Sequence, residues 1–252
     1  MHLSTVLVAC NENTKYLDFW PVVKEAWQKV VGLTCKMVYV GESLPADLEG
    51  DLDVKFFKAI PGWPTATQAQ CIRLLYPALI KTDGAIVISD MDIIPLQDSF
   101  FIDGFKQFDE DKFVSLRGAD ETAKEIYMCY VGGTASRWSD LFGVKCEADI
   151  RQRLTEWASA YPSDGKHAGK GWCTDQIILY NTVKEQSPET VGLCPWTATI
   201  PRLCRTNSDE YMKWSQALEE GLASGKYVDF HMPAFDKYES VIYRTLEGAL
   251  EV

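Results

Sequence analysis

Two aspartates, Asp90 and Asp92, directly follow the apolar stretch 85–89 (AIVIS). Two carboxylates one residue apart at a strand end face the same crevice when the chain turns there. Mn²⁺ and Mg²⁺ prefer oxygen ligands, usually one or two carboxylates together with substrate phosphates. In open α/β sheets, ligands bind at the carboxyl ends of strands. The pair therefore predicts a divalent-cation site for a phosphorylated ligand, although aspartate is also common in turns and N-caps.

The same pair allows a second chemistry. Phosphatases of the haloacid dehalogenase type also place D-x-D after an apolar strand, with the first aspartate, here Asp90, as the nucleophile. Those enzymes usually have the motif on an early strand and a distal acidic signature such as G-D-x-x-x-D. Here the motif lies 90 residues into the chain, and no G-D-x-x-x-D sequence follows it. The context therefore favours metal binding over phosphotransfer.

The composition narrows the class of protein. Of 252 residues, 46% are hydrophobic, and 36 acidic residues against 25 Lys and Arg give a formal charge of −11. This acidic balance argues against a nucleic-acid partner, and it is a first indication that a cation lies between the protein and a phosphorylated ligand. No apolar run reaches the 18 residues typical of a membrane span. The eight cysteines form no C-x-x-C pair, and without a signal-like start they predict reduced thiols in the cytoplasm.

The elements that position the aspartates form an α/β pattern. An apolar strand at 4–10, a helix at 16–31 with apolar residues at helical spacing, and a strand at 34–40 make a βαβ opening,. We expect further strands at 54–57, 85–89, 112–116, 127–131, 196–200 and 227–230, and further helices at 65–79, 150–161 and 174–183. The expected fold is one α/β domain with a mostly parallel central sheet flanked by helices.

Four motifs resemble those of the GT-A glycosyltransferases, and more closely of the retaining family 8 enzymes. In chain order they are Arg73-Leu74-Leu75-Tyr76-Pro77, Asp90-Met91-Asp92, Trp172-Cys173-Thr174-Asp175-Gln176, and His231 with Lys237. The resemblance implies a GT-A catalytic domain over residues 1–252, with a nucleotide-binding half at 1–100 and an acceptor-side half at 101–252. It also implies transfer of a sugar, with retention, from a nucleotide-sugar donor, a UDP-sugar first of all, to a glycan or glycoconjugate acceptor.

The resemblance also assigns roles. Asp90, Asp92 and His231 would bind Mn²⁺ or Mg²⁺, and Asp90 would also contact the donor. Arg73 and Lys237 would bind the donor diphosphate.

The catalytic candidates are Asp175 and Gln176, which would face the donor sugar and the acceptor. Asp175 would act as general base in an inverting enzyme or orient the sugar in a retaining one. Asn11 and Glu12 follow the first strand, where α/β sheets contact the nucleotide. The chain departs from the family at Ala234, where the family has glycine, and in the loop 130–134, which lacks the family's asparagine.

Overall fold

A seven-stranded sheet forms the centre of the molecule, with the strands in the order β3-β2-β1-β4-β7-β6-β8. The computed structural model describes residues 1–195, 200–205 and 216–251. The strands of the sheet are β1 (Leu3–Cys10), β2 (Thr34–Gly41), β3 (Val54–Lys58), β4 (Ala85–Ile88), β6 (Phe113–Ser115), β7 (Val131–Gly133) and β8 (Val191–Leu193). Strands β3, β2, β1 and β4 are parallel to one another, and β6 is parallel to β8. Only β7 runs against its neighbours β4 and β6, so the mostly parallel sheet expected from the sequence is confirmed.

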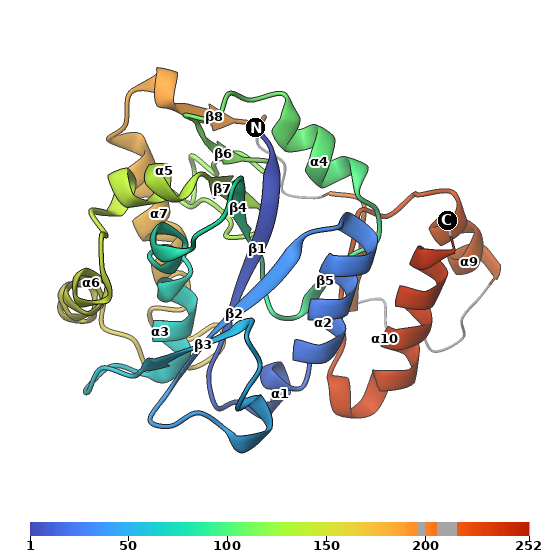
Figure 1. Cartoon of the computed structure of the whole chain (residues 1–252), viewed down its shortest axis with the longest axis horizontal. Coiled ribbons are helices and arrows are strands. Elements are labelled where there is room, and N and C mark those ends of the chain that lie inside the picture. The colour runs from blue at the N-terminus through green and yellow to red at the C-terminus, as the bar shows by residue number, and fades with distance from the viewer. Residues whose placement is uncertain (196–199, 206–215, 252) are drawn as a thin grey trace.

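Helices cover both faces of this sheet (Figure 1). They are α1 (Thr14–Leu17), α2 (Trp20–Ala26), α3 (Thr65–Ile72), α4 (Ser99–Lys106), α5 (Ala135–Phe142), α6 (Glu147–Ala160), α7 (Thr174–Lys184), α9 (Gln216–Ala223) and α10 (Phe235–Leu250). One hydrophobic core joins the sheet to α2, α4 and α10, and a second joins it to α3, α5, α6 and α7. Strand β4 is buried along its whole length, as expected for a parallel strand covered on both sides.

A second, three-stranded sheet lies beside the first. Its strands are β5 (Ile93–Pro95), β10 (Asp229–His231) and β9 (Arg202–Cys204), with β10 in the middle. Strand β5 begins directly after the aspartate pair and is antiparallel to β10. This pairing places the C-terminal part of the chain next to residues 90–92.

Prolines explain two differences from the expected helices. The helix expected at 65–79 ends at Ile72, and a separate 3₁₀ helix runs over Tyr76–Leu79. Pro77 has no N–H to continue an α-helix and disfavours the helical conformation in the residue before it. The helix expected at 16–31 is divided into α1, α2 and a π-helical turn, and Pro21 stands near the start of α2.

The strand expected at 127–131 is wrong in its bounds, because β7 begins only at Val131. Val131 pairs with Ile88, the last residue of β4, so residues before Val131 have no ladder partner on that side. The strand expected at 227–230 is found as β10, and residues 196–199 of the strand expected at 196–200 lie outside the described part of the chain. No helix within the described residues is long and apolar enough to cross a membrane.

Candidate active site

The sheet topology brings several loops to one edge. Strands β1, β4, β6 and β8 point the same way, so the residues that follow them meet at one rim. Strand β7 runs in the opposite direction, and the residues just before it therefore lie at the same rim. Asn11, Asp90 and Arg117 follow strands, and Cys129 precedes one.

A cavity of about 390 Å³ opens at this rim. It lies between the loops after β1 and β4, helix α3, the start of α7 and the loop 162–171. Its wall includes Asn11, Tyr16, Gln70, Arg73, Asp90, Asp92, Arg117, Tyr127, Cys129, His167, Trp172, Asp175, Gln176, Arg202, Arg205 and His231. Three of the four motifs of the sequence thus contribute all their candidate residues to one cavity, and the fourth contributes His231.

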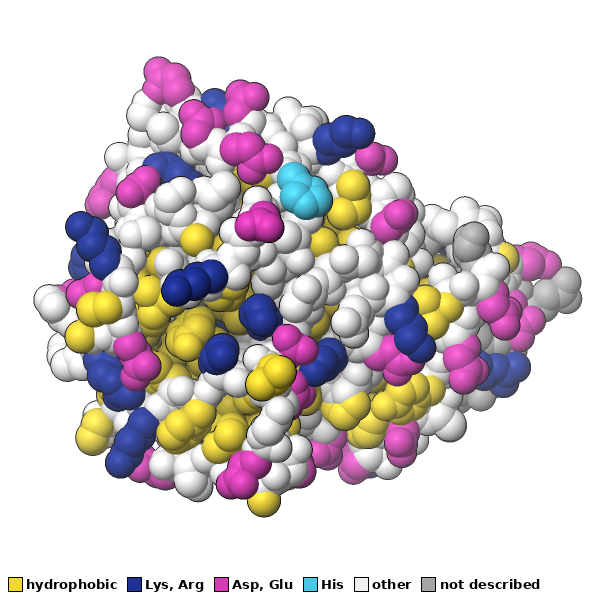
Figure 2. Space-filling view, in the orientation of Figure 1, with side chains coloured by type: hydrophobic (Ala, Val, Ile, Leu, Met, Phe, Trp, Pro, Cys, Tyr) yellow, Lys and Arg dark blue, Asp and Glu magenta, His cyan; other side chains and the backbone are white. Residues whose placement is uncertain are grey.

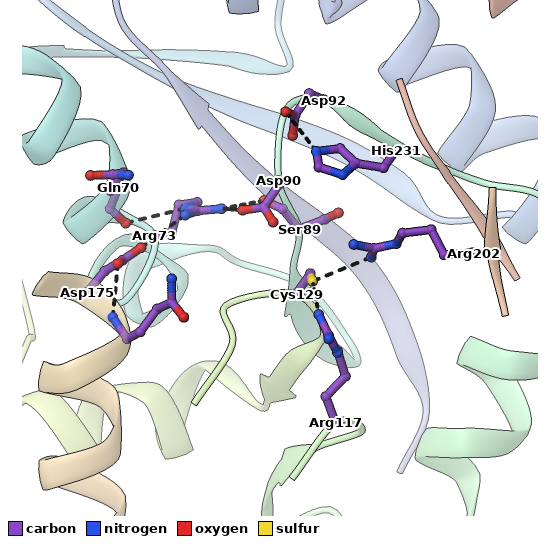
Figure 3. Close-up of polar contacts among 11 residues, drawn as sticks. Gln70, Arg73, Ser89, Asp90, Asp92, Arg117, Cys129, Asp175, Arg202 and His231 are labelled. Carbon is purple, nitrogen blue, oxygen red and sulfur yellow. Dashed lines mark hydrogen bonds and ion pairs between the residues drawn. The ribbon is translucent and has the colours of Figure 1, made fainter. Parts of the chain in front are cut away.

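Arg73, at the end of α3, joins two of these carboxylates. Its Nη1 donates to the carboxylate of Asp90 and, at 3.0 Å, to the carbonyl oxygen of Ser89. Its Nη2 donates to Oδ2 of Asp175 at 3.1 Å. Arg73 is only 6% exposed, so the guanidinium group is held between the two carboxylates at a fixed place in the wall (Figure 3).

Asp175 is a buried carboxylate at the start of α7. Burial raises its pKa to about 6, and the charge of Asp90 adds to this, although Arg73 opposes the shift. The backbone N–H of Gln176 also donates to it at 2.9 Å. A carboxyl group with a pKa near neutrality, facing a cavity, is the kind of group that enzymes use to hold or move protons.

Asp92 forms the second cluster of the wall. Its Oδ2 lies 3.1 Å from Nε2 of His231 and accepts a hydrogen bond from Arg205 at 2.9 Å. Burial alone would raise the pKa of Asp92, but the contacts with His231 and Arg205 outweigh it and hold the pKa below its usual value. Burial alone would lower the pKa of His231, and the bond to Asp92 outweighs it in the same way and raises that pKa.

The Asp92 and His231 pair fits a divalent cation. The 3.1 Å between Oδ2 and Nε2 is the length of their direct hydrogen bond,. Carboxylate oxygen and imidazole nitrogen both suit Mn²⁺. Asp90 is turned toward Arg73 instead. Over the described ranges, no three His, Cys, Asp or Glu side chains form a cluster that could hold a metal ion, so the metal-ligand roles of Asp90, Asp92 and His231 stay predictions.

Comparisons with known proteins find the same fold. No protein-family model and no curated protein sequence matches the chain. Among solved structures, the apo-form glycosyltransferase GlyE of Streptococcus pneumoniae TIGR4 superposes with a TM-score of 0.51 at 11% identity, covering 100% of this chain and 63% of that one. The galactosyltransferase LgtC, solved with donor and acceptor sugar analogues, gives 0.48 at 16% identity, with 98% and 96% covered. Mouse xyloside xylosyltransferase 1 gives 0.44 at 10% identity, with 92% and 97% covered.

The chain has the GT-A fold. The expected fold class is therefore confirmed. The alternative of a haloacid-dehalogenase-like phosphatase is not supported, because the structural match is to a GT-A protein.

The remaining predicted residues lie at different places in this GT-A fold. Asn11 is buried in the cavity wall, and its Nδ2 donates to Oγ1 of Thr65 at 3.1 Å. Glu12 is exposed and does not line the cavity, although it accepts a hydrogen bond from the same threonine at 2.7 Å. Lys237 is exposed in the first turn of α10 and is likewise outside the wall. The roles of Glu12 and Lys237 therefore stay predictions from sequence position alone.

Three arginines that line the cavity were not predicted from the sequence. Arg117 follows β6, Arg202 begins β9, and Arg205 follows β9. None belongs to a recognised motif, and a lone arginine after a short strand gives little signal. The clue available was the predicted topology, because residues after parallel strands meet at one rim. For Arg117 this clue would have sufficed.

Proposed function

We propose that this chain is a glycosyltransferase that moves a sugar from a nucleotide-diphosphate donor, a UDP-sugar, to a glycan or glycoconjugate acceptor, with retention and with Mn²⁺ or Mg²⁺ as cofactor. One observation supports it above all others. Arg73, Asp90, Asp175 and His231, which are far apart in the sequence, line one cavity at the carboxyl ends of the strands of a GT-A fold. Nucleotides bind at this edge in α/β sheets.

In this proposal Asp92 and His231 hold the cation. The bound cation would offset the charge of the diphosphate and stabilise it as a leaving group. Asp90 provides a further carboxylate when it releases Arg73. The Arg73 guanidinium, without Asp90, would then pair with a phosphate or with a hydroxyl of the donor sugar. Its hydrogen bond to the carbonyl oxygen of Ser89 would keep it at the cavity wall.

In this proposal Asp175 and Gln176 hold the donor sugar and the acceptor. The Oε1 atom of Gln176 is buried at the cavity, and within the described residues it has no hydrogen-bond partner. A buried amide oxygen that accepts no hydrogen bond destabilises the folded protein. A hydroxyl group of a bound sugar would donate the missing hydrogen bond. Asp175 lies next to it and can accept a hydroxyl hydrogen bond in its ionised form, which predominates above about pH 6.

The donor and the acceptor approach from different parts of the chain in this scheme. Residues 1–100 supply β1, β4 and the aspartate pair and form the nucleotide-binding half of a single domain. Residues 101–252 supply Asp175, Gln176 and the loop 162–171 and form the acceptor side, and they also contribute His231 to the cation site. Trp172, whose ring lies 4.5 Å from that of His167, offers an aromatic surface on which a sugar ring can stack.

Thermal unfolding with UDP-, GDP- and TDP-sugars, each with Mn²⁺ or with EDTA, tests the proposal. A ligand at one hundred times its Kd stabilises the folded state by about 2.7 kcal/mol, which is a readily measured shift in Tm. We expect the shift with UDP and UDP-sugars only when Mn²⁺ is present. Release of UDP, followed by NMR of the anomeric proton of the product, then tests turnover and retention.

The variant Asp92→Ala tests the metal assignment. It removes the carboxylate that contacts His231, and we expect Mn²⁺-dependent UDP binding to weaken by at least about tenfold, since even outer-shell partners of a metal are worth that much. Calorimetry measures the affinity. Asp103→Ala, an exposed aspartate on α4, is the matched control. Unchanged metal-dependent binding in Asp92→Ala would refute the assignment.

A further inference from the structure

Each carboxylate of the aspartate pair lies against an arginine. Asp90 accepts a hydrogen bond from Arg73, and Asp92 accepts one from Arg205. Acidic and basic side chains are likewise interspersed over the face of the molecule in Figure 2, although the chain has a formal charge of −11. The two arginines differ in their surroundings, and Arg205 has no role in the scheme above.

Arg205 is one of two partners of a single oxygen atom. Oδ2 of Asp92 lies 3.1 Å from Nε2 of His231 (Figure 3), and it accepts a hydrogen bond from Nη1 of Arg205 at 2.9 Å. The Asp92 side chain is only 11% exposed, and a buried carboxylate without a cationic partner would destabilise the folded protein. Arg205 is therefore a counter-ion of Asp92.

Arg205 is held much less firmly than Arg73. The Arg73 side chain is 7% exposed and donates to two backbone carbonyl oxygens and to two carboxylates. The Arg205 side chain is 37% exposed, and within the described residues its guanidinium group donates only to Asp92. A partly exposed ion pair with one point of contact contributes little to stability. Arg205 can therefore leave Asp92 at little cost while Arg73 stays in the wall.

Arg205 contacts the same atom that a divalent cation at Asp92 would need. Its acceptor is Oδ2 of Asp92, and a guanidinium group and a metal ion at one oxygen atom repel each other. Arg205 also lines the cavity in which the proposed nucleotide would bind. Guanidinium groups form strong, often bidentate, bonds with phosphate oxygen atoms. A diphosphate that enters with the cation would therefore offer the displaced Arg205 a better partner.

We propose that Arg205 exchanges partners when the donor binds, leaving Asp92 to the cation and pairing with the diphosphate. This inference rests on the proposed glycosyltransferase function and adds Arg205 to the residues that bind the donor. Its consequence is that the cation and the nucleotide each strengthen the binding of the other. Without the nucleotide, Arg205 loses Asp92 and gains no partner, whereas with the nucleotide it gains the diphosphate.

The variant Arg205→Gln tests this exchange, because it removes the positive charge and leaves the contact between Asp92 and His231 in place. Calorimetry measures the affinity for Mn²⁺ alone and, at saturating Mn²⁺, the affinity for UDP. The variant should bind Mn²⁺ alone about two- to fivefold more tightly than the wild type, which corresponds to the loss of a partly exposed ion pair. It should bind UDP at least about tenfold more weakly, which corresponds to the loss of a hydrogen bond between charged groups.

Two further variants separate the exchange from a general effect of charge. Arg205→Lys keeps the positive charge and should bind Mn²⁺ alone with about the affinity of the wild type. It should still bind UDP more weakly than the wild type, because an ammonium group does not match a phosphate at two points. Arg151→Gln removes an exposed arginine that pairs with Glu147 and is the matched control, which should change neither affinity.

The exchange requires both changes in Arg205→Gln, in opposite directions. Unchanged or weaker binding of Mn²⁺ alone overturns it, because Arg205 then does not compete for Asp92. Unchanged binding of UDP overturns it as well, because Arg205 then does not contact the diphosphate. Either result leaves the proposed function standing as long as UDP binding to the wild type requires Mn²⁺. Failure of UDP to bind the wild type at any Mn²⁺ concentration overturns the proposed function, and the exchange with it.

Discussion

The buried carboxyl group of Asp175 should make the stability of this protein depend on pH in a sense opposite to that of most carboxylates. Burial raises its pKa from 3.8 to about 6, so the folded state binds this proton more tightly than the unfolded chain does. The contribution of the group to stability is therefore full below about pH 4 and is lost as the pH rises through about 6.

The magnitude follows from the two pKa values. Each pKa unit corresponds to about 1.4 kcal/mol, so the difference between 3.8 and about 6 amounts to about 3 kcal/mol of unfolding free energy,. In Asp175→Asn the side chain is neutral at every pH. The free energy of unfolding of the variant minus that of the wild type should therefore rise by about 3 kcal/mol between pH 3.5 and pH 7.5.

Urea unfolding followed by circular dichroism measures this difference. Other titrating groups affect both proteins and cancel in the subtraction, and Asp103→Asn provides an exposed control that should show no such rise. A difference that stays flat with pH would show that Asp175 is solvated or fully neutralised by Arg73. A difference that falls as the pH rises would show that the ion pair with Arg73 outweighs burial and lowers the pKa of Asp175, which would refute the expected pH dependence.

Two further predictions concern the packing between β4 and the second half of the chain. Trp138 is fully buried and donates from Nε1 to the carbonyl oxygen of Ile86 at 3.2 Å, so Trp138→Phe should lower the free energy of unfolding by about 1 to 3 kcal/mol, measured by urea unfolding. In Gly132→Ala the new methyl group would lie 2.9 Å from the same carbonyl oxygen and 2.8 Å from the ring of Phe105, which should cost about 1 to 3 kcal/mol. Gly133→Ala meets its nearest atom only at 3.3 Å and should cost less; equal costs for the two variants would contradict the packing described here.

The fold was largely predictable from the sequence, for a physical reason. The first two strands have eight residues each, are largely apolar and are separated by a helical segment. Segments of this length show their hydrophobic pattern clearly in the sequence. The second half has strands of three residues, which are too short to show a period. For β7 the ladder partner rather than the composition of 127–131 determines where the strand begins.

The site was predictable to the extent that its residues belonged to motifs. Arg73, Asp90 and Asp175 come from three different motifs and line one cavity. Their ion pairs with one another were not predicted, because the motifs implied only that Arg73 binds the donor and Asp90 the metal. The arrangement of Arg117 and Arg202 around Cys129 could not be predicted from the sequence, because it depends on the loop after β6 and the first residue of β9, in different sheets, lying near the same sulfur atom. The spacing of residues along the chain does not show which side chains of different sheets come into contact.

The direction of β7 has a consequence for how this cavity can change in evolution. Strand β7 is antiparallel to β4 and β6. The residues just before β7 therefore lie at the same rim of the sheet as the residues just after β4 and β6. The segment 117–130 therefore reaches the cavity without crossing the sheet, and its ends alone are anchored in strands. Substitutions and insertions within that segment can alter the wall of the cavity while the hydrogen-bonded ladder beneath, and the aspartate pair after β4, stay as they are.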